Sequence, residues 1–162
     1  MAVHLAQLNV GTLRYGPDDP RVAEFMDNLD RVNGIAEAMP GFVWRLKDDS
    51  NNATGIDASG HFADGMIVNM SVWETAEALE RFVWQTVHKR FYQKKAAWFE
   101  AMPAGSGGDS HFVMWWVPAG HRPDLAEASA KLELLRVNGS TEEAFGWEYL
   151  PEMQLWRSQQ CA

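Results

Sequence analysis

The sequence predicts one α+β domain, with a β-α-β-β-α-β core in residues 1–120 and a C-terminal helical extension in residues 121–162. Three observations lead to this expectation. The 162 residues suit a single domain that buries a hydrophobic core. The composition, 46% hydrophobic and 22% charged, is that of a globular protein. Short apolar runs alternate with segments in which apolar residues recur at three- and four-residue spacing, which indicates strands alternating with helices.

The first strand and the first helix are predicted before Pro40-Gly41. Residues 3–13 form an apolar-rich run with a second face that carries polar side chains. Asp19 followed by Pro20 is a good helix start, because aspartate caps free amide groups and proline suits the first helical position. The apolar residues that follow have helical spacing, so we expect an amphipathic helix that ends at the Pro-Gly pair.

Three further strands and a long helix complete the core. Residues 42–47 and 66–73 are strand-like and flank a polar, glycine-containing loop. Thr75 is predicted to cap a helix that runs to about Met102, and residues 111–117 form the fourth strand. The resulting order is the ferredoxin-like, split βαβ arrangement.

The C-terminal extension is predicted to contain a helix and an aromatic tail. Asp124 and Glu127 have the spacing of a capping box, and Gly139 is a typical helix end. The tail that follows is rich in aromatic residues, so we expect it to pack on the same domain.

The strands predict a cover on both faces of the sheet. The second, third and fourth strands are apolar on both faces, which is typical of strands that are buried on both sides. Two helices cover only one face of a four-stranded sheet. A second copy of the chain would cover the other face, and a homodimer is therefore favoured. The C-terminal extension is the competing cover.

Charge and composition exclude several classes of partner. The formal net charge of −8 argues against nucleic acid or an anionic membrane. No apolar run has the length of a membrane span, and the N-terminal residues do not resemble a signal peptide. The one cysteine, Cys161, has no intrachain disulfide partner. We expect a cytoplasmic protein with no membrane association.

A resemblance to known proteins is carried by residues 68–92, VNMSVWETAEALERFVWQTVHKRFY. This segment resembles the antibiotic-biosynthesis-monooxygenase-like superfamily, in which a strand ends in Trp-Glu and a histidine follows in the next helix. Together with HLAQLNVG, PGFVWRL and WWVPAGHRP, it more closely resembles the bacterial domain-of-unknown-function family 3291 over residues 3–145. The resemblance implies the fold of a dimeric α+β barrel. It implies no single reaction, because the superfamily includes cofactor-free oxygenation of aromatics, haem degradation and other activities.

Asn69 and Trp73 are the first candidate site residues. They are four residues apart on a strand, so their side chains point to the same face of the sheet. The resemblance to the aromatic-oxidising branch implies that both line a pocket. There Asn69 would donate a hydrogen bond to a developing oxyanion, and Trp73 would stack on the substrate ring. The alternative is a hydrogen-bonded core asparagine beside a packed tryptophan.

His88 is the second candidate. In one continuous helix it shares a side with Trp84 and Tyr92, at the rim of the apolar stripe. A histidine there is a candidate general acid or base, because its pKa lies near neutrality. Resemblance to the haem-degrading branch implies instead an iron ligand, with Asn9 on the first strand as its companion. The alternative is a surface histidine, or one bonded to a backbone carbonyl.

Other chemistry has less support in the sequence. His121 precedes Arg122-Pro123, where a turn and a helix cap explain the residues as well as anion binding does. No motif for a protein-ligated metal, a nucleophile elbow, a phosphate loop or a dinucleotide fingerprint is present.

Three hypotheses for function follow from these residues. The favoured one is a small-molecule enzyme that resembles cofactor-free monooxygenases and acts on an apolar or aromatic, polyketide-like substrate. In that enzyme His88 and Asn69 are catalytic, and Trp73, Trp84, Tyr92 and Asn9 bind the substrate. The alternatives are a haem-binding or haem-degrading protein and a non-catalytic, ligand-binding dimer.

Overall fold

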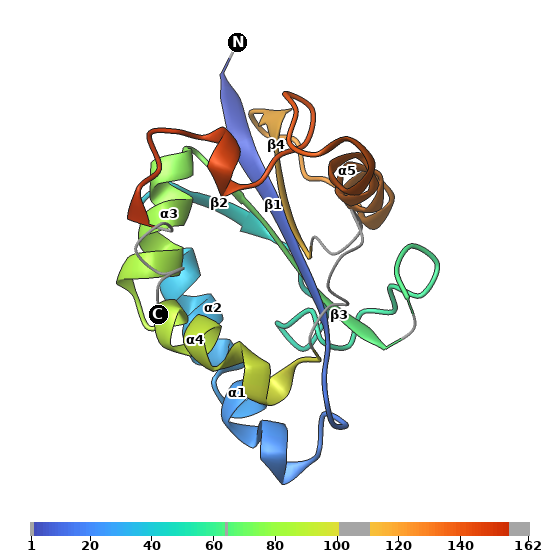
Figure 1. Cartoon of the computed structure of the whole chain (residues 1–162). Coiled ribbons are helices and arrows are strands. Elements are labelled where there is room, and N and C mark those ends of the chain that lie inside the picture. Colours follow the sequence, from blue (N-terminus) through green and yellow to red (C-terminus); the bar gives the residue numbers. More distant parts are fainter. Residues whose placement is uncertain (1, 64, 101–110, 156–162) are drawn as a thin grey trace.

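The computed structural model describes residues 2–63, 65–100 and 111–155, and it confirms the predicted α+β fold (Figure 1). The strands are β1 (Val3–Thr12), β2 (Phe42–Arg45), β3 (Met66–Trp73) and β4 (Phe112–Pro118). They form one four-stranded sheet in the order β2-β3-β1-β4. Every neighbouring pair is antiparallel, which is the ferredoxin-like topology.

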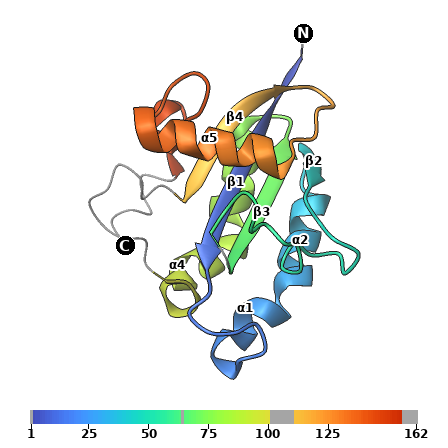
Figure 2. The same cartoon turned by 90° about the vertical axis from the view of Figure 1, so that its right-hand side faces the viewer.

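The helices lie on both sides of this sheet. Those on one side are the short 3₁₀ turn η1 (Pro20–Val22), α1 (Ala23–Asp27), α2 (Leu29–Ala38), α3 (Ala76–Gln85) and α4 (His88–Trp98). On the other side α5 (Leu125–Asn138) crosses the strands, as Figure 2 shows. The short 3₁₀ turn η2 (Trp147–Tyr149) belongs to the C-terminal segment.

The first predicted helix begins where expected but is interrupted. The Asp19 side chain accepts a hydrogen bond from the backbone amide of Arg21, and Pro20 opens η1. Asn28, with φ −102° and ψ 2°, then separates α1 from α2. Its side chain donates to the carbonyl oxygen of Glu24 at 2.8 Å, so the asparagine competes with the helical hydrogen-bond ladder at this point.

The prediction of one continuous helix after Thr75 is wrong. Thr75 does cap α3 by accepting a hydrogen bond from the amide of Ala78. Thr86 is extended, however, with φ −121° and ψ −174°, and it ends α3. Its hydroxyl donates to the carbonyl oxygen of Phe82 at 2.6 Å and accepts from the amide of His88 at 3.2 Å. One threonine thus ends α3 and begins α4. The predicted end near Met102 lies outside the described residues.

One face of the sheet, which we call the core face, is closely packed at its centre. Its central side chains are each at most 2% exposed, although no second chain is present, and the partly buried Val43, Trp44 and Met66 pack at its margin. Ala128, Leu132 and Leu135 of α5 pack against it, together with Ala58 of the loop after β2. Both α5 and this loop lie over the same face in Figure 2. The core-face residues are Ala6, Leu8, Val10, Val68, Met70, Val72, Val113, Trp115 and Val117.

This packing changes the basis for predicting a dimer. Both faces of the strands are apolar, as expected, but the chain's own extension covers the core face. A second copy is therefore not required to bury these side chains. Dimerisation stays a prediction that the structure of one chain does not test.

The start of α5 explains His121. Asp124 accepts a hydrogen bond from the amide of Glu127 at 2.8 Å, as predicted. The Glu127 carboxylate does not return to complete the capping box. It accepts instead from Trp115 Nε1 at 2.8 Å and contacts His121 Nε2 at 2.6 Å. His121 thus helps to attach α5 to β4, which favours the structural interpretation of this histidine.

The C-terminal segment returns to the sheet after α5. Met114 of β4 and Phe145 exchange two backbone hydrogen bonds of 2.8 and 2.9 Å, so the segment extends the sheet beyond the edge strand. Phe145 is fully buried, and Leu150 and Met153 join the cluster between the sheet and α3. The described part of the aromatic tail therefore packs on the body of the protein.

Candidate functional site

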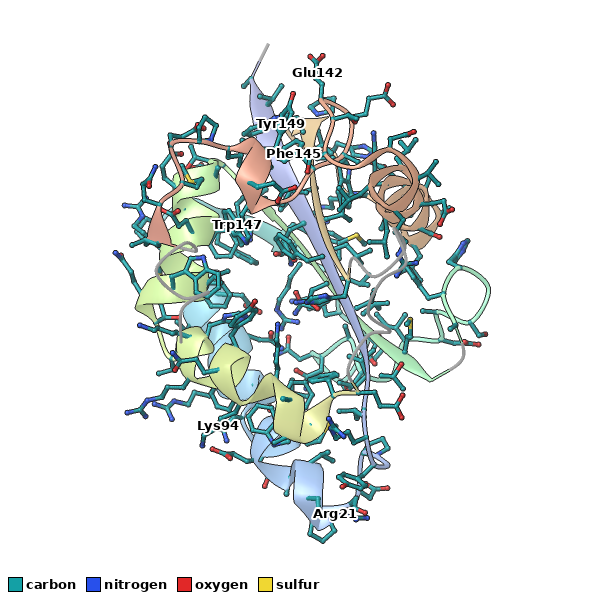
Figure 3. The ribbon with its side chains drawn as sticks, viewed as in Figure 1. Arg21, Lys94, Glu142, Phe145, Trp147 and Tyr149 are labelled. Atoms are coloured by element: carbon teal, nitrogen blue, oxygen red, sulfur yellow. The ribbon has the colours of Figure 1, made fainter. Side chains whose placement is uncertain are left out.

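A cavity of about 650 Å³ lies between the sheet and the helices α1 to α4. Most of its polar lining comes from the second face of the sheet, which we call the cavity face, where the side chains alternate with those of the core face. Val10, Val68 and Met70 of the core face and Leu135 of α5 also contribute to the lining. The side chains around this space are drawn in Figure 3. All of the predicted site residues line the cavity, and their chemical roles stay predictions: Asn9, Asn69, Trp73, Trp84, His88 and Tyr92.

A hydrogen-bonded set of side chains, which we call the polar floor, lies on the central strands. The Gln7 amide nitrogen donates to Asn69 Oδ1 at 2.9 Å and to Ser71 Oγ at 2.8 Å. Trp73 Nε1 also donates to Ser71 Oγ, at 2.9 Å. The register places Asn9 directly opposite Asn69. Because Gln7 occupies the Asn69 carbonyl oxygen, the Asn69 NH₂ group is left as a donor for a ligand.

Gln7 and Ser71 were missed as site residues. Their exposed fractions are 5% and 8%, and buried polar groups of this kind are normally hydrogen-bonded. The sequence contains a signal for both. Gln7 lies on the polar face of the first strand with Asn9, and Ser71 lies between Asn69 and Trp73 at the two-residue period of a strand.

Trp73 lies deeper than a substrate-stacking residue would. Its side chain is fully buried. The Phe82 ring stacks on it with centroids 5.3 Å apart, and Phe42 meets it edge-on at 5.4 Å. Because Phe82 covers one face of the indole, Trp73 packs behind Phe82 and is hydrogen-bonded to Ser71, both of which line the cavity.

His88 is the first residue of α4 and not the middle residue of a long helix. Its ring lies 4.9 Å from that of Phe82, and Nδ1 is 3.3 Å from the carbonyl oxygen of Val83. A carbonyl oxygen only accepts, so the contact places the ring proton on Nδ1. Nε2 then carries a lone pair, and no hydrogen bond within the described residues occupies it.

The imidazole of His88 is neutral at pH 7. Burial lowers its pKa from 6.5 to about 4, because the charged form loses hydration, and the hydrogen bond to Val83 opposes this only in part. The lone pair on Nε2 is available to accept a proton from a ligand in the cavity, although the lowered pKa makes this imidazole a weaker base than an ordinary histidine.

Trp84 and Tyr92 meet for a different reason from the one predicted. They lie on separate helices because the chain breaks at Thr86, so the expected spacing along one helix does not apply. Their rings nevertheless make an edge-to-face contact with centroids 4.9 Å apart. Among the described residues, the buried Trp84 Nε1 has no hydrogen-bond partner.

One end of the cavity is closed by an ion pair that the sequence does not reveal. Arg45 is 7% exposed and donates to Glu37 of α2 at 2.6 Å. It also donates to the carbonyl oxygen of Asn51 at 2.6 Å, which holds the loop after β2 in place. Because its charge is paired within the protein, we assign Arg45 a structural role at this end.

The described part of the chain contains neither a metal cluster nor a membrane helix. No group of three or more histidine, cysteine, aspartate or glutamate side chains converges there in a way that would hold a metal ion. No helix in those same ranges is long and apolar enough to cross a bilayer.

The fold and the cavity define a ferredoxin-like α+β protein with a cavity that many aromatic side chains line. A family model described as "Domain of unknown function (DUF3291)" matches residues 4–161, so the chain belongs to this family. No curated protein matches the chain significantly.

Solved structures from two bacteria are similar in fold. SnoaB, a cofactor-independent oxygenase from Streptomyces nogalater, matches with 19% identity and a TM-score of 0.43, over 75% of this chain and 97% of that chain. A protein of unknown function from Nitrosomonas europaea matches with 13% identity and a TM-score of 0.43, over 76% of this chain and 97% of that chain.

Proposed function

We propose that this protein is a small-molecule enzyme that oxygenates an aromatic, polyketide-like substrate without a cofactor. His88 would be the base and Asn69 would orient the substrate oxygen. The observation that carries the proposal is the neutral imidazole of His88, with Nε2 unoccupied, in the same cavity as the polar floor.

The size and the lining of the cavity support an aromatic substrate. A volume of about 650 Å³ lies within the range of small-molecule sites. Aromatic side chains from both helices and strands surround it, and rings of this kind favour stacked or edge-on contacts with a planar ligand. The aromatic lining residues include Phe25, Phe42, Phe82, Trp84, Phe91, Tyr92, Trp98, Phe99, Phe112 and Trp147.

The polar groups support activation of a substrate that carries a carbonyl or a phenol. His88 Nε2 would remove a proton from an acidic C–H or O–H group, which leaves a carbanion or phenolate. The negative charge gathers on the substrate oxygen, where the Asn69 NH₂ group would donate a hydrogen bond. Such a fixed donor in an apolar cavity stabilises charge more than water does, because it needs no reorganisation.

The oxidant in this proposal is molecular oxygen. The carbanion transfers one electron to oxygen, and the resulting radical pair combines to form a C–O bond. The imidazolium of His88 returns its proton to the peroxide, which gives a hydroperoxide. Loss of water, with cleavage of the O–O bond and of a C–H bond on the same carbon, then gives a carbonyl. For anthrone the balance is one anthrone and one oxygen to one anthraquinone and one water.

Oxygen uptake with anthrone tests the proposal. Wild-type protein is expected to consume one oxygen for each anthraquinone formed, faster than buffer does. His88→Gln and Asn69→Ala should lose this acceleration, whereas Lys94→Gln should keep it because Lys94 lies outside the cavity lining. An equal rate with and without protein would contradict the proposal. A Soret band that saturates at one haem per chain on titration with haemin would favour the haem alternative instead.

A further inference from the structure

One cation in the wall of the cavity, Lys95, has no carboxylate partner among the described residues. Lys95 is half-buried on the last turn of α4, and its side chain lines the cavity. Its ammonium group lies 4.0 Å from the centroid of the Tyr92 ring, which is a cation–π contact. Within the described ranges Lys95 forms no ion pair.

Its neighbour in sequence has the opposite surroundings. Lys94 forms an ion pair of 2.7 Å with Glu24 of α1, and both side chains are about half exposed, 54% and 51%. Figure 3 labels Lys94 on the side of α4 that lies next to α1. The helix therefore directs one lysine to a carboxylate at the surface and the next lysine to the cavity.

A second cation lies near Lys95. Arg14 lines the same cavity, and its Nε donates to the carbonyl oxygen of Ala96 at 2.7 Å, next to Lys95 along α4. His111 also lines the cavity, but burial and the charges of Lys95 and Arg136 lower its pKa, which favours its neutral form, so it adds no charge.

The carboxylates of the lining do not neutralise this end of the cavity. Glu148 accepts a hydrogen bond from Ser140 and forms no ion pair with Lys95 in the described structure. Glu100 is exposed, and its carboxylate is not ion-paired with Arg14 or Lys95 among the described residues. Within the described part of the chain, a negatively charged ligand group would therefore meet Lys95 and Arg14 without a carboxylate already paired to either.

We propose that Lys95 binds a carboxylate substituent of the aromatic substrate, so that the ligand class is an aromatic carboxylate. Tyr92 holds the ammonium group when the cavity is empty, and a carboxylate replaces this weaker cation–π contact with a charge-assisted hydrogen bond. The inference rests on the proposed function only in taking this cavity as the substrate site.

Calorimetric binding of 3-hydroxy-2-naphthoate and of its methyl ester tests this proposal. The two probes share a ring system and a phenol but differ in charge. Wild-type protein is expected to bind the carboxylate, called the acid below, with a lower dissociation constant than the methyl ester. Lys95→Met should weaken binding of the acid roughly 10- to 100-fold, as for loss of a hydrogen bond to a charged group, and change binding of the ester less than about twofold.

Lys94→Met is the matched control, and both affinities should stay unchanged in it. Equal loss of both probes in Lys95→Met would show that the lysine only packs against the ring, and equal acid binding by Lys95→Met and wild type would also overturn the proposal. Failure of both probes to bind wild type would contradict it as well. Lys95-dependent binding of the acid without oxygen uptake from anthrone would refute the oxygenase function and keep the carboxylate site.

Discussion

The two faces of the sheet are built from the same four strands in opposite ways. The central side chains of the core face are apolar and each at most 2% exposed, and α5 packs directly on them. The cavity face carries Gln7, Asn69 and Ser71, and a cavity of about 650 Å³ separates much of it from the helices. Residues that are adjacent in sequence therefore belong to different environments, because strand side chains alternate.

This difference indicates a division between stability and chemistry. The core face is closely packed along the central strands, whereas the cavity face is packed only at one end, where Leu5, Trp73 and Met114 join a second buried cluster. Polar groups on the cavity face are hydrogen-bonded to one another, which keeps them oriented without filling the space. Substitutions on the core face should change the free energy of unfolding, and substitutions on the cavity face should change binding and turnover.

The largest effect is expected for His88→Gln. Loss of the general base should lower the rate of anthrone oxidation by roughly 10²- to 10⁴-fold. Because the pKa of His88 is lowered to about 4, the wild-type rate should hold below pH 6 and fall only as the pH approaches that value. Oxygen uptake measured across pH checks both points, and a wild-type rate that halves near pH 6.5 would contradict the lowered pKa.

Leu132→Ala tests the packing of the core face. Leu132 is 1% exposed and belongs to the cluster that joins α5 to the strands. Removing its side chain should lower the free energy of unfolding by about 2–5 kcal/mol, as for other buried leucines. Denaturant unfolding gives this value. A loss below about 1 kcal/mol would show that α5 does not supply the cover of this face.

The buried imidazole also predicts a pH dependence of stability. The pKa of His88 is about 4 in the folded protein, compared with its ordinary value of 6.5, so the unfolded chain binds more protons between these values. Stability is therefore complete above about pH 6.5 and declines as the pH falls toward 4. Across that window wild type should lose roughly 2–3 kcal/mol more than His88→Gln does.

The free energy of unfolding of wild type and of His88→Gln should be measured in urea across this pH range. An equal loss in both proteins would show that the pKa of His88 is not lowered in the folded protein. The lowered pKa of His111 contributes equally to both proteins, so it cancels in the difference between them.

The smallest effect is expected at the break between α3 and α4. Thr86→Val removes the hydroxyl that joins Phe82 and His88, which should lower stability by about 1 kcal/mol and also lower the rate, because His88 loses its anchor. Thr75→Val is the matched control, since it removes a helix cap of about 1 kcal/mol away from His88. Equal rates in the two variants, measured by oxygen uptake, would contradict a positioning role for Thr86.

The local pattern of the sequence predicted much of the fold. Strand bounds, the Asp19 and Thr75 caps and the order of elements follow from side-chain periodicity and capping chemistry. The break at Thr86 was not predicted, because a threonine within an apolar helical pattern is compatible with a continuous helix. Only the hydrogen bonds between its hydroxyl and the backbone of Phe82 and His88 distinguish two separate helices from one continuous helix.

The sequence predicted only part of the site, because only some of its contacts follow from the local periodicity of side chains. Asn69 and Trp73 share a face through strand periodicity, which a sequence reveals directly. The bonds from Gln7 to Asn69 and Ser71 span 62 and 64 residues and depend on the register between β1 and β3. The cover of the core face by α5 depends likewise on tertiary packing, so the sequence left the extension and a second copy as competing covers.

Asn69 and Leu8 provide the most direct test of the division between the faces. They lie on the neighbouring strands β3 and β1, but Asn69 lines the cavity, whereas the fully buried Leu8 belongs to the core face and is not among the cavity-lining residues. Asn69→Ala and Leu8→Ala should be compared by denaturant unfolding and by oxygen uptake per folded molecule. We predict that Asn69→Ala stays within about 1 kcal/mol of wild-type stability and loses roughly 10²- to 10³-fold in rate. Leu8→Ala should lose about 2–5 kcal/mol and keep the wild-type rate. The reverse pattern, or equal losses in both variants, would contradict the account.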